Sequence, residues 1–366
     1  MDSPLSFKKD GFGIDISDQS IKIVGLKKGK NGLSLAFFGE RQIANGLIEA
    51  GMIKDEEKVA SVIRDMLKAV SGKKPKTNRV ISSLPEGKAF FQVIQIPKMS
   101  DLELKKAVPL EAENYIPMPA EEMVLGFQAI KPFVDHLDHL DVLIAAIPLA
   151  VANSYVLVLR KAGLKPLAME VESQAIVRAI IKKEQSPFPV LLIDLGAVRT
   201  SFIIFSGRSL RFTSSIPISS LKMTEVIAKN LNIGQKEAEE LKINYGLSVP
   251  KDQVGKSVFD SLIPSASALV EQIKICINYY QTHSEHEHLL PGVVGLEKII
   301  LCGGGANLKG LDDFLVQELC LPVIVGNPWV NVLSEEAVEI PALPYQKSLA
   351  YTTAIGLAMA SFQKYD

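Results

Sequence analysis

The sequence predicts an α/β protein made of two similar halves that face a common cleft. Strand-like runs alternate with helical patterns along the 366 residues, which indicates sheets covered by helices. Two segments, "FGIDISDQSIKIVGLK" at 12–27 and "LLIDLGAVRTSFIIF" at 191–205, each read as strand, acid, turn and strand. A glycine-rich loop, Gly303–Leu308, follows another buried strand. A duplicated domain is the simplest account of the paired hairpins.

The composition is that of a globular protein. The hydrophobic fraction is 47% and the charged fraction is 22%. A net charge of −1 gives no overall field that would recruit nucleic acid, so we expect no nucleic-acid partner. Cys276, Cys302 and Cys320 lack C-x-x-C spacing, which indicates reduced thiols in the cytoplasm. The opening residues, MDSPLSFKKDG, lack the apolar core of a signal peptide.

Apolar runs and turn residues define the expected elements. The predicted strands are Phe12–Ile16, Ile21–Lys27, Leu33–Phe38, Arg79–Ser83, Ala89–Ile96, Val142–Ile147, Val190–Asp194, Thr200–Phe205, Ile299–Cys302 and Val323–Val325. The predicted helices are Glu56–Val70, Leu102–Tyr115 with Met123 after it, Ser173–Lys183, Met223–Leu231, Lys236–Asn244, Ser265–His283, one near Leu311 and Tyr351–Ala360. Ser100 is the expected N-cap of the second helix.

The stretch Val142–Leu159 carries no charge and has nearly the length of a membrane span. Pro148, Asn153 and Tyr155 interrupt it. We therefore favour a strand that ends near Ile147, a helix that begins at Pro148 and a stop at Gly163.

Each hairpin carries an aspartate at its turn, Asp15 in the first and Asp194 in the second. An ionised carboxylate is costly to bury without a partner. Two such turns across a cleft could hold a triphosphate through backbone N–H groups and a divalent metal through the carboxylates. We therefore expect Asp15 and Asp194 to bind magnesium. The alternative is that both aspartates only make turn hydrogen bonds.

The small and basic residues of these turns are the candidate phosphate contacts. They are Ser17, Ser20 and Lys22 in the first hairpin and Gly196, Ala197 and Thr200 in the second. Lys22 could equally be a solvated strand lysine. Gly303, Gly304, Gly305 and Asn307 would let the backbone approach a flat ligand closely. Their spacing is neither a Rossmann fingerprint nor a P-loop.

The chain resembles the actin-like ATPase superfamily. Its first phosphate hairpin, second phosphate hairpin and adenosine loop correspond in order to Gly13–Lys22, Asp194–Ser201 and Gly303–Leu308. The resemblance implies two lobes around a cleft that binds ATP and Mg²⁺. It also makes Glu239 and Lys242, in "KEAEELKINYG", the candidate ribose and base contacts.

Within that superfamily the chain resembles the PilM family of type IV pilus assembly. The distinctive block is Ser82–Ile130, in particular Ile96–Ser100 and Glu111–Pro117, together with "AMEVESQAIVRA" at Ala168–Ala179. This resemblance implies a cytoplasmic protein, peripheral at the inner membrane within the pilus assembly complex. It would bind the cytoplasmic tail of a PilN-like protein, and self-association stays open.

The same resemblance implies a domain plan with an inserted small α/β domain. The first lobe would comprise residues 1–82 and the connecting helix in 164–188. The inserted domain would be 83–163, the second lobe 189–346, and residues 347–366 would return to the first lobe.

Two departures bear on activity. Ser17 stands where the family usually has glycine, and Asp18 adds an acid that repels phosphate unless a metal intervenes. Arg199 stands where smaller residues are usual, and it could reach a phosphate or point to solvent. No residue is an evident general base. Glu172 is a candidate, but a helix-start carboxylate favoured by the dipole is the simpler interpretation. We therefore expect ATP binding with little or no hydrolysis.

The sequence leaves other functions open. An FtsA-like filament-forming division protein is the main alternative, although the chain stops at "ASFQKYD" without the expected linker and amphipathic helix. A sugar kinase would need a catalytic aspartate that we do not identify. His283–His288 could ligate metal and Gly72–Arg79 is basic, but a solvated loop is the simpler interpretation of both.

Overall fold

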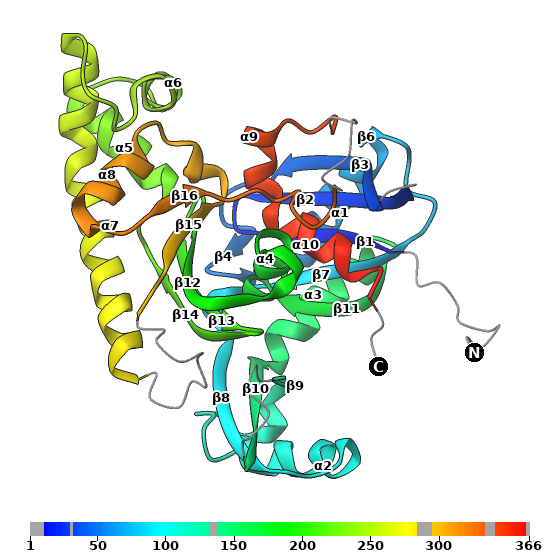
Figure 1. The fold of residues 1–366 in the computed structure, drawn as a ribbon. Coiled ribbons are helices and arrows are strands. Elements are labelled where there is room, and N and C mark those ends of the chain that lie inside the picture. The colour runs from blue at the N-terminus through cyan, green and yellow to red at the C-terminus, as the bar shows by residue number, and fades with distance from the viewer. Residues whose placement is uncertain (1–10, 30–31, 132–137, 284–294, 334–340, 364–366) are drawn as a thin grey trace.

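The computed structural model describes residues 11–29, 32–131, 138–283, 295–333 and 341–363. These residues form a six-stranded, a five-stranded, a three-stranded and a two-stranded sheet. Figure 1 shows the two larger sheets side by side and the small sheet below them. All three cysteines are free thiols, so no disulfide staples the fold.

The first large sheet holds the first predicted hairpin near its centre. Its order is β11 (Lys165–Val171), β7 (Arg79–Leu84), β1 (Phe12–Ile16), β2 (Ser20–Gly29), β3 (Gly32–Gln42) and β6 (Ser71–Gly72). β1 runs antiparallel to β2 and parallel to β7. A short hairpin of β4 (Ile48–Glu49) and β5 (Met52–Ile53) and helix α1 (Glu56–Lys68) follow β3. Val59 and Ile63 of α1 pack with Ile14 and Ile23 of the sheet.

The second large sheet repeats this plan. Its order is β14 (Ser209–Ile216), β13 (Thr200–Gly207), β12 (Ser186–Leu195), β15 (Lys298–Cys302) and β16 (Val323–Val325). β12 runs antiparallel to β13 and parallel to β15, as β1 does to β2 and β7. Four helices pack their apolar faces on it: α5 (Ser220–Leu231), α6 (Gln235–Tyr245), α7 (Gln253–His283) and α8 (Leu311–Leu319). The repeated topology confirms the predicted duplication.

The small sheet consists of β8 (Phe90–Pro97), β10 (His139–Pro148) and β9 (Met123–Ala129), with β10 in the middle. Helix α2 (Asp101–Ala112) covers it through Leu104 and Val108. Ser100 and Glu103 form a reciprocal capping box, which confirms the predicted N-cap.

The uncharged stretch Val142–Leu159 divides as predicted. It forms most of β10, and helix α3 (Leu149–Lys161) begins directly after Pro148. Among the described residues, no helix combines the length and the apolar character needed to cross a bilayer.

The packing of α3 indicates where the inserted domain ends. Val151 and Tyr155 of α3 lie in the core of the first large sheet, so we propose that the inserted domain ends at Pro148.

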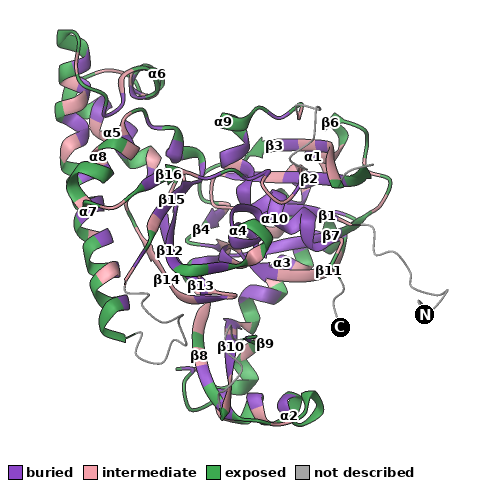
Figure 2. Cartoon of the chain, in the orientation of Figure 1, coloured by how far each residue is buried: buried purple, intermediate pink, exposed green. Residues whose placement is uncertain are grey.

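Helix α10 (Thr352–Ala360), preceded by α9 (Tyr345–Ser348), lies between the large sheets with α4 (Glu172–Ile180). Figure 2 shows that α4 and α10 are largely buried, and every residue of α10 is buried. A Cβ at Gly13 would clash with the α10 backbone, and a Cβ at Gly356 would clash with Ala175 of α4. These glycines are therefore explained by the close approach of helix to strand and of helix to helix.

Several predictions of individual elements were wrong. Met123 begins β9 rather than continuing a helix, and β9, β11 and β14 were not predicted. Helix α7 begins at Gln253 and runs through Pro264, whereas the sequence suggested a start after that proline. β9 and β14 lie at the edges of their sheets, where only one side of the strand is paired. They therefore carry exposed or polar residues, and their sequences lack the apolar pattern that predicts a strand.

Candidate functional site

The first hairpin turn is closed by its own serines. The Ser17 amide and its hydroxyl both donate to the Ser20 carbonyl, at 3.0 and 2.9 Å. Ser17 thus closes the turn through both its backbone amide and its side chain. Lys22 Nζ donates to Ser20 Oγ at 2.6 Å and lies 3.7 Å from Glu40 Oε1. Lys22 is therefore directed into the site rather than solvated.

The second hairpin turn rests on the start of helix α5. The Gly196 amide donates to the Arg199 carbonyl at 3.0 Å, and a Cβ at Gly196 would lie 2.8 Å from that oxygen. The amides of Ser220 and Leu221 donate to the carbonyls of Gly196 and Ala197. The turn is thus fixed by backbone hydrogen bonds, and only a glycine fits its tightest point.

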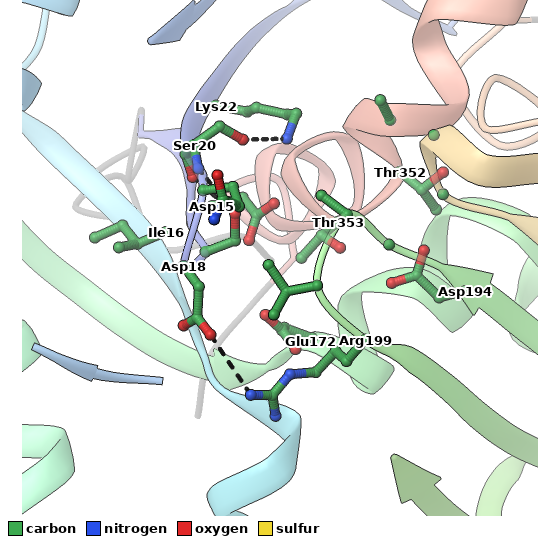
Figure 3. Close-up of a pocket in the computed structure, with 18 of the residues that line it drawn as sticks. Asp15, Ile16, Asp18, Ser20, Lys22, Glu172, Asp194, Arg199, Thr352 and Thr353 are labelled. Carbon is green, nitrogen blue, oxygen red and sulfur yellow. Dashed lines mark hydrogen bonds and ion pairs between the residues drawn. The ribbon is translucent and has the colours of Figure 1, made fainter. Parts of the chain in front are cut away.

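Both turns line one cavity of about 250 Å³ between the two large sheets. Figure 3 shows Asp15 and Lys22 on one side and Asp194 and Arg199 on the other. The predicted residues that line it are Asp15, Ser17, Ser20, Lys22, Asp194, Gly196, Ala197, Gly303 and Gly304. Asp15 and Gly304, almost 300 positions apart in the sequence, therefore meet at one site.

Asp15 and Asp194 are held in an environment that disfavours their charge. Desolvation raises the pKa of Asp15, and Lys22 and a hydrogen bond from Ser83 offset part of this effect. Desolvation and the nearby Asp15 charge raise the pKa of Asp194 to about 6. Asp15 Oδ1 is buried, and none of the described residues gives it a hydrogen bond. Groups perturbed in this way concentrate at functional sites.

Glu86, which is buried, and Glu172, which is half-buried, add two further carboxyls next to the cavity. The Glu86 amide donates to Glu172 Oε2, and the Ser173 amide at the start of α4 donates to Glu86 Oε2, both at 3.1 Å. Desolvation, together with Asp15, raises the pKa of Glu172 well above its usual value. Desolvation also raises the pKa of Glu86. Glu172 is thus a half-buried residue that lines the cavity, not the exposed helix-start carboxylate that the sequence predicts.

The glycine-rich loop closes the cavity at the Asp194 side. Gly303 has a φ of +79°, and a Cβ there would clash with the Asp194 carboxylate. Gly304 faces Ala350 and lines the cavity. A Cβ at Gly305 would clash with the Leu195 side chain, so glycine is needed there for the loop to pack against Leu195.

Five of the predicted ligand contacts do not line this cavity: Thr200, Glu239, Lys242, Gly305 and Asn307. Thr200 is buried, and its hydroxyl donates to the Ile218 carbonyl at 2.7 Å. Lys242 Nζ pairs with Glu239 Oε2 at 2.7 Å and donates to Ser220 and Thr224. Asn307 Nδ2 donates to the carbonyls of Gly304 and Gln346. Their roles as nucleotide contacts stay predictions.

Other lining residues were not proposed as ligand contacts from the sequence. Glu40, Pro85, Tyr155, Thr352 and Thr353 come from β3, the end of β7, α3 and α10. Glu86, which does not line the cavity but contacts the lining residue Glu172, follows β7 as Asp15 stands near the end of β1, and β1 and β7 are parallel. An acid at the end of a buried strand is the signal that could have found it.

The carboxylates of Asp15 and Asp194 are the cavity's candidate ligands for magnesium. Among the described residues, no group of three or more His, Cys, Asp or Glu side chains is placed to enclose a metal ion. Mg²⁺ commonly uses one or two carboxylates and retains several waters, the remaining ligands coming from a phosphate. Asp15, whose Oδ1 has no hydrogen-bond partner among the described residues, and Asp194 could serve as these one or two carboxylate ligands. His286 and His288 lie outside the described residues, so the histidine cluster stays untested.

The fold resembles solved actin-like proteins. A PilM–PilN type IV pilus biogenesis complex aligns with a TM-score of 0.79 at 24% identity, covering 98% of this chain and 100% of that one. MreB5 of Spiroplasma citri, bound to AMPPNP, aligns with a TM-score of 0.52 at 14% identity over 95% of each chain. The chain therefore has the actin-like ATPase fold that the sequence predicted.

The sequence is similar to cell division protein FtsA and to the PilM family. FtsA, the cell division protein of Pseudomonas aeruginosa, is 26% identical over 220 residues, which cover 56% of this chain and 50% of FtsA. The chain thus spans about half the length of that relative. A model of type IV pilus assembly protein PilM matches residues 13–362, nearly the whole chain. The chain belongs to the PilM family of type IV pilus assembly proteins.

Proposed function

We propose that this protein is an ATP-binding adaptor of type IV pilus biogenesis that captures the cytoplasmic tail of a PilN-like membrane protein. ATP and Mg²⁺ would occupy the cavity between the hairpins. The protein would be cytoplasmic and peripheral at the inner membrane, within the pilus assembly complex.

One observation carries the nucleotide assignment. The cavity gathers the raised-pKa carboxyls of Asp15 and Asp194, the basic Lys22 and the glycines Gly303 and Gly304. Buried carboxyls of this kind are costly unless a cation accompanies them. A metal–phosphate ligand supplies that cation, and the similar fold of MreB5 binds an ATP analogue.

The partner assignment rests on the family. The chain belongs to the PilM family, and a solved PilM of the same fold forms a complex with PilN. An FtsA-like division role is the second candidate, supported by the 26% identity to FtsA. Two results together would favour the division role over the adaptor role. The purified protein would form filaments on lipid in electron microscopy, and deletion of its gene would leave pili unaffected.

The test is binding of labelled ATP with Mg²⁺ by the purified protein and by Asp15→Ala and Asp194→Ala. Asp65→Ala, which removes an exposed helix carboxylate, is the matched control. We expect binding by the wild type and the control and loss in both cleft variants. A labelled cytoplasmic tail of the PilN-like protein from the same genome should bind at micromolar concentration. If the wild type binds no ATP, the nucleotide assignment is wrong; if no tail binds with or without ATP, the adaptor assignment is wrong.

A further inference from the structure

An ion pair joins the two hairpin turns across the cavity. Arg199 Nη2, from the turn after β12, lies 3.6 Å from Asp18 Oδ2, in the turn after β1 (Figure 3). Both side chains line the cavity, and they are largely buried, with exposures of 27% and 12%. The pair therefore links the hairpin turns of the two large sheets.

Asp18 is the fixed member of this pair. Its Oδ1 accepts a hydrogen bond from the Gly51 amide at 2.8 Å. The Gly51 carbonyl in turn accepts one from the buried Tyr155 hydroxyl at 3.1 Å. The Asp18 carboxylate is therefore anchored to the turn between β4 and β5, which helix α3 holds through Tyr155.

Arg199 is the adaptable member. A separation of 3.6 Å exceeds hydrogen-bond length, so the pair has charge attraction without a good hydrogen bond. The other terminal nitrogen, Nη1, lies over Gly87, where a Cβ would clash with it. Gly87 thus leaves room for the guanidinium and offers it no side-chain acceptor. A phosphate, which accepts two parallel hydrogen bonds from arginine, is a better partner than this carboxylate.

The position of the pair identifies which phosphate it would meet. Gly303 and Gly304 close the cavity beside Asp194, whereas the Arg199 side chain starts on the same side as Asp194 and extends its guanidinium away from it, toward Asp18 (Figure 3). A nucleotide held at the glycine loop would extend its phosphates from Asp194 toward Arg199. We infer that Arg199 binds the terminal phosphate of ATP and that Asp18 holds the guanidinium in place when that phosphate is absent. The inference rests on the proposed nucleotide site and adds the residue that distinguishes ATP from ADP.

The test measures the dissociation constants of Mg-ATP and Mg-ADP by titration calorimetry. Arg199→Met should weaken ATP binding about 10- to 100-fold, the usual loss for a hydrogen bond to a charged group, and change ADP binding less than about twofold. Asp18→Asn removes the competing charge and should strengthen ATP binding. Gly87→Ala, at an ordinary φ, should displace the guanidinium and weaken ATP binding in the same direction as Arg199→Met.

Lys222→Met is the matched control, because it removes a charge of the same sign at an exposed pair with Glu225. It should leave both constants unchanged, and thermal unfolding of each variant will establish that it is folded. Equal losses for ATP and ADP in Arg199→Met, or weaker ATP binding in Asp18→Asn, overturn the inference while the nucleotide site stands. Failure of the wild type to bind either nucleotide would instead refute the proposed function.

Discussion

Replacing Asp194 by Asn should stabilise the nucleotide-free protein at alkaline pH. Desolvation and the Asp15 charge raise the pKa of this carboxyl to about 6 in the folded state, against 3.8 for an ordinary aspartate. Because the folded state binds the proton more tightly than the unfolded state, ionisation costs stability. The cost is absent below pH 3.8, grows as pH rises, and is complete above about pH 6.

The size of the cost follows from the pKa difference. One pKa unit corresponds to about 1.4 kcal/mol, so the full cost is about 3 kcal/mol, and about half of it is already present at pH 5. This is an upper value, because part of the carboxyl surface faces the water-accessible cavity. The asparagine variant keeps the shape of the side chain and carries no charge, so it avoids the cost.

Urea unfolding at pH 5 and pH 8 measures the effect. The stabilisation by Asp194→Asn should be larger at pH 8 by about 1 kcal/mol. Asp313→Asn, at a carboxylate in the first turn of α8 away from the cavity, is the control and should show no such dependence. The reasoning is refuted if the gain is the same at both pH values or if Asp194→Asn destabilises more at pH 8.

Three further substitutions probe the packing around the cavity. Gly356→Ala should destabilise the fold by about 1–3 kcal/mol, because its methyl group would overlap the Ala175 carbonyl of α4; the melting temperature should fall. Lys242→Met should lower the free energy of unfolding by about 1–3 kcal/mol, since Ser220, Thr224 and Glu239 lose their shared donor; an unchanged urea midpoint would contradict this. Tyr155→Phe should cost about 1 kcal/mol through the lost bond to Gly51, and it should also loosen Asp18, which hydrogen exchange of the Gly51 amide would detect as faster exchange.

The sequence was most informative where a short pattern carries its own physical reason. An acid at the end of an apolar strand, repeated in two halves, predicted the paired hairpins at Asp15 and Asp194, and both line the cavity. The order strand, Ser100, helix predicted an N-cap that the capping box confirms. Each of these patterns lies within one short segment, so it can be interpreted without knowledge of the fold.

The edge strands gave no such signal. β14 ("SLRFTSSI") is mostly half-buried and polar, so it reads as a loop until β13 pairs with it. The glycine at position 13 reads as part of a phosphate loop, yet the helix that requires it, α10, lies more than three hundred residues later. Such requirements come from neighbours distant in sequence, which no local pattern reports.

The sequence by itself determined the α/β class, the duplication and the acids and glycines that could bind a nucleotide. Only the tertiary structure decided which of them share one cavity and which, like Thr200 and Lys242, are satisfied by bonds elsewhere. It also paired Asp18 with Arg199 and placed Glu172 against the Glu86 backbone at the edge of the cavity. The physical reason is that burial, pKa and ion pairing depend on which distant segments surround a side chain, whereas the propensity to form a strand or a turn is largely a property of the segment itself.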